Sequence, residues 1–438
     1  MRITVVGLGK IGLPLAVQYA GRGHEVTGVD IDPTVVASVN AAVPPFPGEA
    51  ELPERLAAVV GAGLLGASTD TAGAVSTSDA VVVVVPLYVD QEARPDFSAI
   101  DGATAAVARG LRPGTVVLYE TTLPVGTTRH RLAPALAAGS GIDPDDLLLA
   151  FSPERVYSGR VFSDLRRYPK LVGGVTDGSA RRAVAFYDAV LEFDPRPDLD
   201  RDNGVWDLGT AEAAELAKLA ETTYRDVNIA LANQFTRHAD GLGVDVHRVI
   251  EACNSQPFSH IHSPGVAVGG HCIPVYPRLY LWNDPEASVV RAARAANAAM
   301  PAWVVELLAR EHGDLVGQRV LILGAAYRGG VKETAFSGVF PVAEALRARG
   351  AVPVVHDPLY SPEELRAFGL EPHRLGDSAD ALVLQADHAE YRELGAADVP
   401  GVRTAVDGRH TLDPERWPGV RLVVLGEPRV ARPHPARA

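Results

Sequence analysis

The feature that most constrains this chain is a glycine-rich turn at residues 7–12, GLGKIG. A short β-branched run, Arg2–Val6, precedes the turn, and a predicted helix follows it as far as Gly21. A second apolar run, Glu25–Val29, ends at Asp30. A strand, a G-x-G-x-x-G turn, a helix, a strand and an acid in this order predict a βαβ unit that binds a dinucleotide.

Each part of this unit has an expected role. Gly7, Gly9, Ile11 and Gly12 are expected to contact the cofactor: the glycines let the backbone approach a pyrophosphate, and the N-terminus of the following helix offers it partial positive charge. Asp30 is expected to accept hydrogen bonds from ribose hydroxyls and to repel the 2′-phosphate of NADP, which predicts NAD as the cofactor. The alternative is a glycine-rich turn that binds no nucleotide.

Strand and helix patterns continue along the chain. Strands are predicted at 80–85, 115–119 and 146–151. Helices are predicted in the middle third, at 210–242, 244–253 and 287–311. A second α/β region has predicted strands at 318–324, 352–356, 381–384, 404–406 and 421–425, with a helix near 339–349. The predicted fold class is α/β, with two Rossmann-like, doubly wound, parallel-sheet domains joined by a central all-helical region.

Composition narrows the possible partners. The 438 residues can form two or three domains, and 41 basic against 54 acidic residues give a net charge of −13, which argues against nucleic acid. Two cysteines cannot form a disulfide framework, so a cytoplasmic location is predicted. The N-terminus lacks a signal-peptide pattern and the apolar run Ala80–Pro86 is too short to cross a bilayer, so no membrane association is expected. No metal site is predicted.

One cysteine has the surroundings of a nucleophile. Cys272 lies in Gly265–Pro277, GVAVGGHCIPVYP, where glycines precede it and prolines follow it. A thiol in a tight turn, in a chain that also binds a hydride acceptor, indicates oxidation through a covalent thioester. The alternative is a small buried hydrophobic residue, which is the role expected for Cys253. His271 is not assigned as a base, because neighbours in sequence usually point apart.

Several motifs occur in an order that resembles the UDP-glucose/GDP-mannose dehydrogenase family, the NAD-dependent nucleotide-sugar 6-dehydrogenases. They are GLGKIGLP (7–14), ETTLPVGTT (120–128), SPERV (152–156), AELAKLAETTYRDVNIALAN (214–233), HSPGVAVGGHCIP (262–274), GAAYRGGVKETAFSG (324–338), HDP (356–358), ADALVLQADHAEY (379–391) and DGRH (407–410). The SPERV form is similar to the branch that oxidises UDP-N-acetylhexosamines.

The resemblance implies a reaction and its catalytic residues. The C6 hydroxymethyl of a nucleotide hexose (UDP-glucose, dTDP-glucose or a UDP-N-acetylhexosamine) would become a carboxylate at the expense of two NAD, through a thiohemiacetal and a thioester on Cys272. Lys218, in an apolar helical segment, would act as a base or stabilise an oxyanion. Glu154 would act on the water that hydrolyses the thioester, and Thr122 would position that water or contact the nicotinamide. A surface lysine and a turn hydroxyl are the alternatives for Lys218 and Thr122.

The resemblance also implies binding residues. Besides the glycine-rich turn, Pro86, Thr122 and Lys332 are expected to contact the cofactor. Contacts with the nucleotide sugar are expected from Glu154, Arg155, Lys218, Thr222, Gly265, Gly269, Tyr276, Tyr327 and Arg328. Tyr327 and Arg328 match an aromatic residue and a cation near the diphosphate, with exposed surface residues as the alternative.

Two positions depart from the family pattern. The family has Asp four residues after the nucleophile and Asn four residues after the catalytic lysine, where this chain has Tyr276 and Thr222. Both positions are expected to belong to one small polar network beside the catalytic lysine. Either this network has re-formed for an altered substrate, or the chain is a non-catalytic paralogue that binds nucleotide sugars. A single-step, two-electron NAD dehydrogenase with a structural Cys272 is a further alternative. The sequence leaves the nucleotide and the sugar open.

The resemblance divides the chain into parts. Residues 1–205 are predicted to form the NAD-binding domain, and residues 206–312 a central helical dimerisation region with the catalytic loop. Residues 313–430 are predicted to form the nucleotide-sugar-binding domain, followed by a disordered tail at 431–438. A homodimer is expected.

Overall fold

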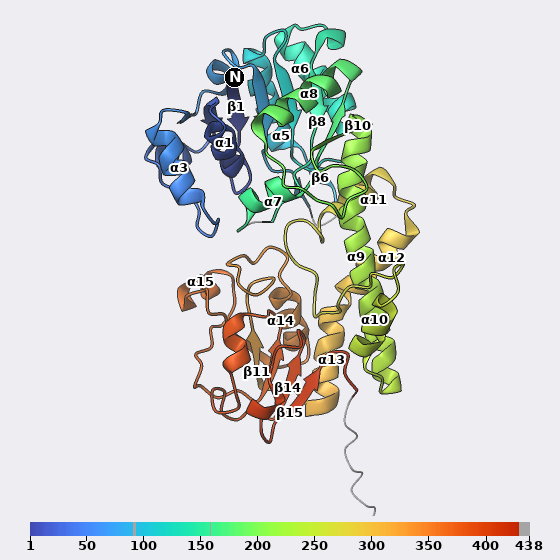
Figure 1. The fold of residues 1–438 in the computed structure, drawn as a ribbon. Coiled ribbons are helices and arrows are strands. Elements are labelled where there is room, and N and C mark those ends of the chain that lie inside the picture. Colours follow the sequence, from blue (N-terminus) through green and yellow to red (C-terminus); the bar gives the residue numbers. More distant parts are fainter. Residues whose placement is uncertain (91–92, 158, 429–438) are drawn as a thin grey trace, which may run out of the picture. The chain divides into compact units, whose positions relative to one another are not determined.

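The computed structural model describes residues 1–90, 93–157 and 159–428, and the predicted tail at 431–438 lies outside them. The chain forms two compact units. Unit 1 comprises residues 1–221 and 278–285, and unit 2 comprises residues 222–277 and 286–438. The long helix α9 (Ala211–Leu242) contributes residues to both units (Figure 1). The predicted division into three domains stays a prediction.

Unit 1 is built on an eight-stranded sheet among the described residues, in the order β10-β9-β8-β7-β4-β1-β2-β3. The strands are β1 (Arg2–Val6), β2 (Glu25–Val29), β3 (Leu65–Ser68), β4 (Ala80–Val83), β7 (Val116–Tyr119), β8 (Leu149–Phe151), β9 (Lys170–Gly174) and β10 (Val205–Thr210). The paired strands are parallel except for β8 and β9, which are antiparallel. The strand order reverses between β1 and β4, which is where sheets of this kind bind their ligands.

Helices cover both faces of this sheet (Figure 1). One face packs against α1 (Gly12–Gly21), α2 (Pro33–Asn40), α3 (Leu52–Gly61), α7 (Val161–Arg167) and α8 (Asp177–Val190). The other face packs against α4 (Thr71–Val75), α5 (Ser98–Gly110), α6 (Ala133–Ser140) and the start of α9. The strands are therefore apolar on both faces: Val82 joins one core and Val83 the other.

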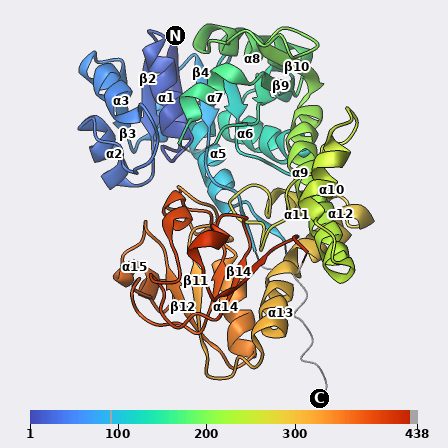
Figure 2. The same cartoon turned by 60° about the horizontal axis from the view of Figure 1, so that its bottom comes forward.

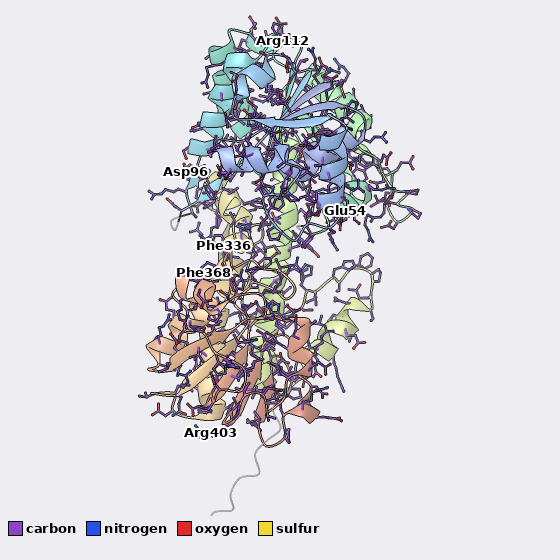
Figure 3. The ribbon with its side chains drawn as sticks, turned by 90° about the vertical axis from the view of Figure 1, so that its left-hand side faces the viewer. Glu54, Asp96, Arg112, Phe336, Phe368 and Arg403 are labelled. Atoms are coloured by element: carbon purple, nitrogen blue, oxygen red, sulfur yellow. The ribbon has the colours of Figure 1, made fainter. Side chains whose placement is uncertain are left out.

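A small hairpin lies between β4 and α5. It consists of β5 (Tyr88–Val89) and β6 (Pro95–Asp96), which pair antiparallel. Asp96, labelled in Figure 3, accepts the backbone N–H of Ser98 at 2.9 Å and so supports the first turn of α5.

Unit 2 contains a five-stranded parallel sheet in the order β12-β11-β13-β14-β15 among the described residues. The strands are β11 (Arg319–Leu323), β12 (Val352–His356), β13 (Ala381–Leu384), β14 (Thr404–Asp407) and β15 (Arg421–Val424). Helices α13 (Met300–His312) and α14 (Val339–Ala348) cover one face (Figure 2). The other face packs against residues of the 3₁₀ helix Ala389–Glu393 and of loops, including Trp417.

Among the described residues, the remaining α-helices are α10 (Val246–Asn254), α11 (Tyr276–Asn283), α12 (Ser288–Ala298) and α15 (Pro362–Ala367). The predicted single helix at 287–311 is wrong. The chain forms α12 and α13 with a junction at Ala299, and Pro301 occupies the first turn of α13, where its missing N–H costs no hydrogen bond.

Three predicted strands in unit 1 have different bounds in the structure. β4 ends at Val83 rather than 85, β7 begins at Val116 rather than 115, and β8 begins at Leu149 rather than 146, after a 3₁₀ turn at Pro144–Asp146. Strands β3, β5, β6, β9 and β10, and several helices including α11, were not predicted. The predicted α/β fold class is confirmed.

Candidate active site

The glycine-rich turn after β1 has the geometry of a dinucleotide cradle. Gly7 has a φ of +93°, and a Cβ there would lie 2.7 Å from the carbonyl oxygen of Val84. A Cβ on Gly12 would lie 1.8 Å from the carbonyl oxygen of Gly7, so the turn requires glycine at both positions. At Gly9 a Cβ would meet no atom of the described residues within 4 Å. Gly9 therefore faces open space beside the N-terminus of α1, where a pyrophosphate fits.

Asp30 is positioned from two sides. Its Oδ2 accepts the backbone N–H of Leu8 at 2.8 Å, and its Oδ1 accepts that of Asp32 at 3.0 Å. These bonds hold the carboxylate at the end of β2, beside the glycine-rich turn. The residues present therefore fit NAD: glycines for the pyrophosphate and a fixed acid for the ribose.

The loops after β4 and β7 meet at the same edge of the sheet. The Thr121 hydroxyl donates to the carbonyl oxygen of Val85 at 2.5 Å, which joins the two loops. Of the predicted cofactor contacts, Pro86 is exposed in the first loop and Thr122 is buried in the second.

Glu154 belongs to a buried cluster that the sequence did not predict. Lys170 Nζ lies 2.7 Å from Glu154 Oε2 and 2.8 Å from Glu120 Oε2. Tyr187 and Tyr19 donate hydroxyl hydrogen bonds to Glu120 Oε1 at 2.7 and 3.2 Å. One ammonium group thus contacts two carboxyl groups, of which that of Glu120 is buried and that of Glu154 is half-buried.

The two carboxyl groups differ in acidity. Burial raises the pKa of Glu120 to about 7, although Lys170 acts against this rise. Burial also favours the neutral form of Glu154, but the charge and hydrogen bond of Lys170 and the backbone N–H of Arg155 outweigh it, so the pKa of Glu154 is lowered. The geometry thus favours an ionised Glu154, the form needed in a general base.

Lys218 is buried on α9, beside the fully buried Leu219. Thr222 lies one turn further along the same helix and is also fully buried. The neighbouring Leu216 is exposed, so the predicted apolar surroundings hold on one side of Lys218 only. Burial agrees with a functional lysine better than with a surface one.

The first turns of α9 are tied to the loop after β7 by Glu215, which the sequence analysis did not single out. Its Oε1 accepts both the N–H and the hydroxyl of Thr128, at 2.9 and 2.6 Å, and its Oε2 accepts the N–H of Gly126 at 2.6 Å. Burial raises the pKa of Glu215 to about 7, with these hydrogen bonds acting in the opposite direction.

In unit 2, the loop that carries Cys272 is fixed by its backbone. The carbonyl oxygen of Cys272 accepts the N–H of Tyr276 at 2.9 Å, where α11 begins. Gly270, with a φ of +92°, donates its N–H to the carbonyl oxygen of Ala335 at 2.8 Å. The thiol is free and half-buried, a combination that suits a positioned nucleophile.

Tyr327 packs directly against this loop. A Cβ on Gly269 would lie 2.6 Å from the Cβ of Tyr327 and 3.0 Å from the carbonyl oxygen of Phe336, a residue labelled in Figure 3. Arg328 Nε donates to the Tyr327 hydroxyl at 3.2 Å. Two predicted substrate residues, Tyr327 and Arg328, therefore lie at the predicted catalytic loop.

Gly265 is held by a chain of buried amides. Asn233 Oδ1 accepts the N–H of Gly265 at 3.0 Å, and Asn233 Nδ2 donates to Asn297 Oδ1 at 2.9 Å. Asn297 Nδ2 in turn donates to Asp226 Oδ1 at 2.8 Å, and Arg294 forms an ion pair with the same oxygen at 2.6 Å. The chain connects α9 and α12 to the start of the catalytic loop.

Two predictions concern charged residues outside these clusters. Lys332 Nζ lies 2.5 Å from Glu364 Oε1, in the first turn of α15, so its expected contact with the cofactor stays a prediction. His271 is exposed and its Nε2 lies 3.4 Å from Glu333 Oε2, which gives it a partner other than Cys272.

Three domain models of one known protein family match this chain. Residues 1–191 match the NAD binding domain of the UDP-glucose/GDP-mannose dehydrogenase family, residues 212–299 its central domain, and residues 321–414 its UDP binding domain. The chain belongs to this family. It is an NAD-dependent oxidoreductase of the nucleotide-sugar dehydrogenase type, and the predictions of the family, the enzyme class and the cofactor are confirmed.

Known relatives are similar over almost the whole chain. A UDP-N-acetyl-D-mannosamine dehydrogenase of Pyrococcus horikoshii is 34% identical over 94% of this chain and 96% of its own length. An NDP-N-acetyl-D-galactosaminuronic acid dehydrogenase of Ralstonia solanacearum is 31% identical over 90% of this chain and 92% of its own. A solved UDP-D-ManNAc dehydrogenase structure from Pyrococcus horikoshii superposes with a TM-score of 0.86 at 31% identity, over 98% of this chain and 100% of that one.

The described residues contain no cluster of three or more His, Cys, Asp or Glu side chains placed to hold a metal ion. Within the same residues, no helix combines the length and the apolar character needed to span a membrane.

Proposed function

We propose that this enzyme oxidises the C6 hydroxymethyl of a UDP-N-acetylhexosamine to the carboxylate, with two NAD consumed, through a covalent intermediate on Cys272. The observation that carries the proposal is the fixed, half-buried thiol of Cys272 in a loop against which Tyr327 packs. A structural cysteine would not need a glycine loop held by hydrogen bonds on both sides.

When bound, NAD supplies the hydride acceptor for both oxidations. In the first, Lys218 takes the hydroxyl proton or stabilises the developing oxyanion, and C6 becomes an aldehyde. The Cys272 thiolate then adds to the aldehyde carbon: a C–S bond forms and the carbonyl electron pair moves to oxygen. Loss of a second hydride from C6 converts this thiohemiacetal into a thioester.

Hydrolysis completes the cycle. Glu154 takes a proton from a water molecule, and the water oxygen attacks the thioester carbon. The C–S bond breaks, the sulfur leaves as a thiolate, and the product is a carboxylate. The lowered pKa of Glu154, in which burial is outweighed by Lys170, supports its role as the proton acceptor.

Two observations support an N-acetylated UDP sugar. The SPERV segment after β8 is similar to the branch that oxidises UDP-N-acetylhexosamines. The relatives from Pyrococcus horikoshii and Ralstonia solanacearum are also named for N-acetylhexosamine derivatives. Arg155 in this segment has a buried Nε with no hydrogen-bond partner among the described residues. A buried donor without an acceptor suits a site that a ligand completes.

The test is the amount of NADH formed per nucleotide sugar consumed, with NAD in excess, across UDP-glucose, dTDP-glucose, GDP-mannose and UDP-N-acetylhexosamines. We expect two NADH per sugar and a preference for one N-acetylated UDP sugar. One NADH per sugar would instead identify a single-step dehydrogenase. Binding without turnover would identify a non-catalytic paralogue, the alternative that Tyr276 and Thr222 raise.

Two cysteine variants make this test more specific. Cys272→Ser is expected to lower the rate of the second oxidation by on the order of 1000-fold, because the hydroxyl is not ionised near neutral pH. Cys253→Ser on α10 is the matched control and should keep the parent rate. In Glu154→Gln, mass spectrometry should detect a sugar adduct on the protein that the Cys272→Ser background abolishes. A Cys272→Ser enzyme that forms the second NADH at the parent rate would contradict the covalent mechanism.

We also propose a homodimer that forms through α9. Tyr224, Leu231, Phe235 and Leu242 are spaced by seven, four and seven residues, which places them on one helical face, and they are exposed by 52, 44, 36 and 64%. A row of large apolar side chains in water is typical of a surface that a second copy covers. The cytoplasmic location stays a prediction.

A further inference from the structure

The direction of β9 places a lysine at the edge of the sheet that carries the site. In parallel strands the carboxyl ends share one edge, and Glu120 and Glu154 follow β7 and β8 there. β9 runs antiparallel to β8, with Phe151 opposite Gly173, so its first residue, Lys170, reaches the same edge. The reversal of one strand therefore brings an ammonium group between two carboxylates.

Glu120 and Lys170 are closed off from solvent, whereas Glu154 is partly exposed. The side chains of Lys170, Glu120 and Glu154 are 4, 0 and 11% exposed. Isolated charges at such positions are costly, and one ammonium can balance one carboxylate only. Either one carboxyl group holds a proton or an excess negative charge stays buried.

The difference in burial favours Glu120 as the carboxyl group that holds the proton, because its side chain is 0% exposed and that of Glu154 is 11% exposed. Glu120 is surrounded by Tyr19 and Tyr187, and its pKa is raised to about 7 by burial, with the charge of Glu154 adding to the effect. Glu154 faces Lys170 on one oxygen and accepts the N–H of Arg155 at 2.8 Å on the other, and its pKa is lowered. Lys170 contacts both carboxyl groups at nearly equal distances, so the fuller burial of Glu120, rather than the position of the cation, favours the proton there.

We propose that Lys170 is a positioning residue that keeps Glu154 ionised and aimed at its substrate, and that Glu120 stores the balancing proton and holds Lys170 in place. This inference rests on the proposed function of Glu154 as the base for hydrolysis. Lys170 itself stays protonated throughout and touches neither substrate nor cofactor.

The other ionisable groups near the cluster have hydrogen-bond or ion-pair partners of their own. Tyr19 on α1 and Tyr187 on α8 face Glu120, and burial raises the pKa of both well above its usual value, so they stay neutral donors. The guanidinium group of Arg155 donates to the carbonyl oxygen of Pro169 at 2.6 Å and lies 4.0 Å from Glu221. Glu154 and Glu120 are therefore the carboxyl groups whose ionisation Lys170 influences.

The first experiment compares the pH dependence of thioester hydrolysis in Lys170→Met and Lys170→Arg. Removing the cation should raise the pKa of Glu154, so the acid limb of the hydrolysis rate should move up by about one pH unit or more in Lys170→Met. Lys170→Arg keeps the charge and should retain the parental limb. The KM for the sugar should change by less than about threefold in both, because Lys170 does not bind it. A purely structural role predicts lower rates without a shifted limb, which would overturn the proposal.

The second experiment introduces Glu120→Gln alone. Glutamine is neutral, like a protonated Glu120, so the acid limb should stay within about 0.3 pH unit of the parental position. If Glu120 were ionised instead, removing its negative charge would lower the pKa of Glu154 and move the limb down, which would contradict the role of Glu120. If Lys170→Met does not fold, as judged by thermal unfolding and NAD titration, Lys170→Gln is compared with Lys170→Arg in its place, and coincident limbs of these two variants would overturn the proposal.

A readout without turnover separates this inference from the proposed function. Infrared difference spectra between about pH 5 and pH 8 report protonation of carboxyl groups directly. Relative to the parent, Lys170→Met should show an additional protonated carboxyl band that disappears when Glu154→Gln is added, whatever reaction the enzyme performs. Its absence would contradict the inference even if the enzyme forms two NADH per sugar, whereas its presence in an enzyme that forms one would contradict only the proposed function.

Discussion

At the scale of single residues, Asp30 connects the glycine-rich turn to the choice of cofactor. Both of its oxygens accept backbone N–H groups, from Leu8 and Asp32, so the carboxylate cannot turn away from the ribose position. A fixed negative charge there favours NAD over NADP through repulsion of the 2′-phosphate.

We predict that Asp30→Asn weakens this discrimination. The amide keeps one acceptor but loses the charge, and a hydrogen bond to a charged group contributes about 1.5–3 kcal/mol, so the KM for NAD should rise by about 10-fold or more with little change in kcat. Steady-state kinetics with NAD and NADP measure the effect. Asp32→Asn, two residues away, is the control, because Asn also caps a helix and the KM ratio should stay parental. An unchanged ratio in Asp30→Asn would refute the assignment.

Sequence analysis predicted individual residues where a local pattern carried the information. The glycine-rich turn and Asp30 follow from a spacing within thirty residues, and Cys272 from its neighbours. Lys170 and Glu120 were not predicted, because their importance depends on the direction of β9, which no local pattern fixes. The one available signal was a lysine directly before the apolar run LVGG.

At the scale of elements, buried polar side chains connect helices to the loops of the site. Glu215 holds the first turns of α9 to Gly126 and Thr128, behind the loop that carries Thr122. Three hydrogen bonds satisfy a carboxyl group that is buried away from water. Glu215 therefore links the orientation of α9, and with it that of Lys218, to the protonation of one side chain.

We predict that this link makes stability depend on pH. The folded pKa of Glu215 is raised by burial to about 7, above its usual 4.5, so its contribution is fully present below about pH 4.5 and is lost as pH rises through about 7. The difference corresponds to about 3 kcal/mol at most. Relative to Glu215→Gln, the parent should lose free energy of unfolding between about pH 5 and pH 8 in denaturant titrations.

Glu212→Gln is the matched control for this prediction. Glu212 lies one turn earlier on α9, and its pKa is lowered mainly by the hydrogen bond from Arg129. Its contribution is present above its usual pKa and is lost only as pH falls, so the sign is opposite. Equal pH dependence in the parent and Glu215→Gln would show that Glu215 does not titrate in this range.

Elements were predicted well where hydrophobic periodicity was long or the apolar run was unbroken. α9 begins one residue from its predicted start, and β1, β2 and β12 have their predicted bounds. The junction between α12 and α13 was missed, because the alanine-rich helical pattern continues through Ala299 and Pro301 is tolerated in a first turn.

At the scale of the whole molecule, each unit places a turn of small residues after its first strand, at the point where the strand order reverses. In unit 2 the order is β12-β11-β13-β14-β15, and Gly324 after β11 lies against Ala386 after β13. Asp357 after β12 accepts the N–H groups of Ala325 and Ala326, much as Asp30 accepts that of Leu8 in unit 1. The two α/β units thus use the same device, an acid after one strand that orders the turn after its neighbour.

The last prediction concerns assembly through the exposed apolar face of α9. Leu231→Glu would place a charge among Tyr224, Phe235 and Leu242 of the partner copy, and an unpaired buried charge should weaken association by about 100-fold or more. Light scattering coupled to size-exclusion chromatography should give the mass of a dimer for the parent and of a monomer for Leu231→Glu. Val316→Glu, at a 65% exposed apolar position away from α9, should remain dimeric. If Leu231→Glu keeps the dimer mass and thermal stability of the parent, α9 does not form the interface. A parent that is monomeric at all concentrations would leave this apolar face exposed to water and would contradict the proposed homodimer itself.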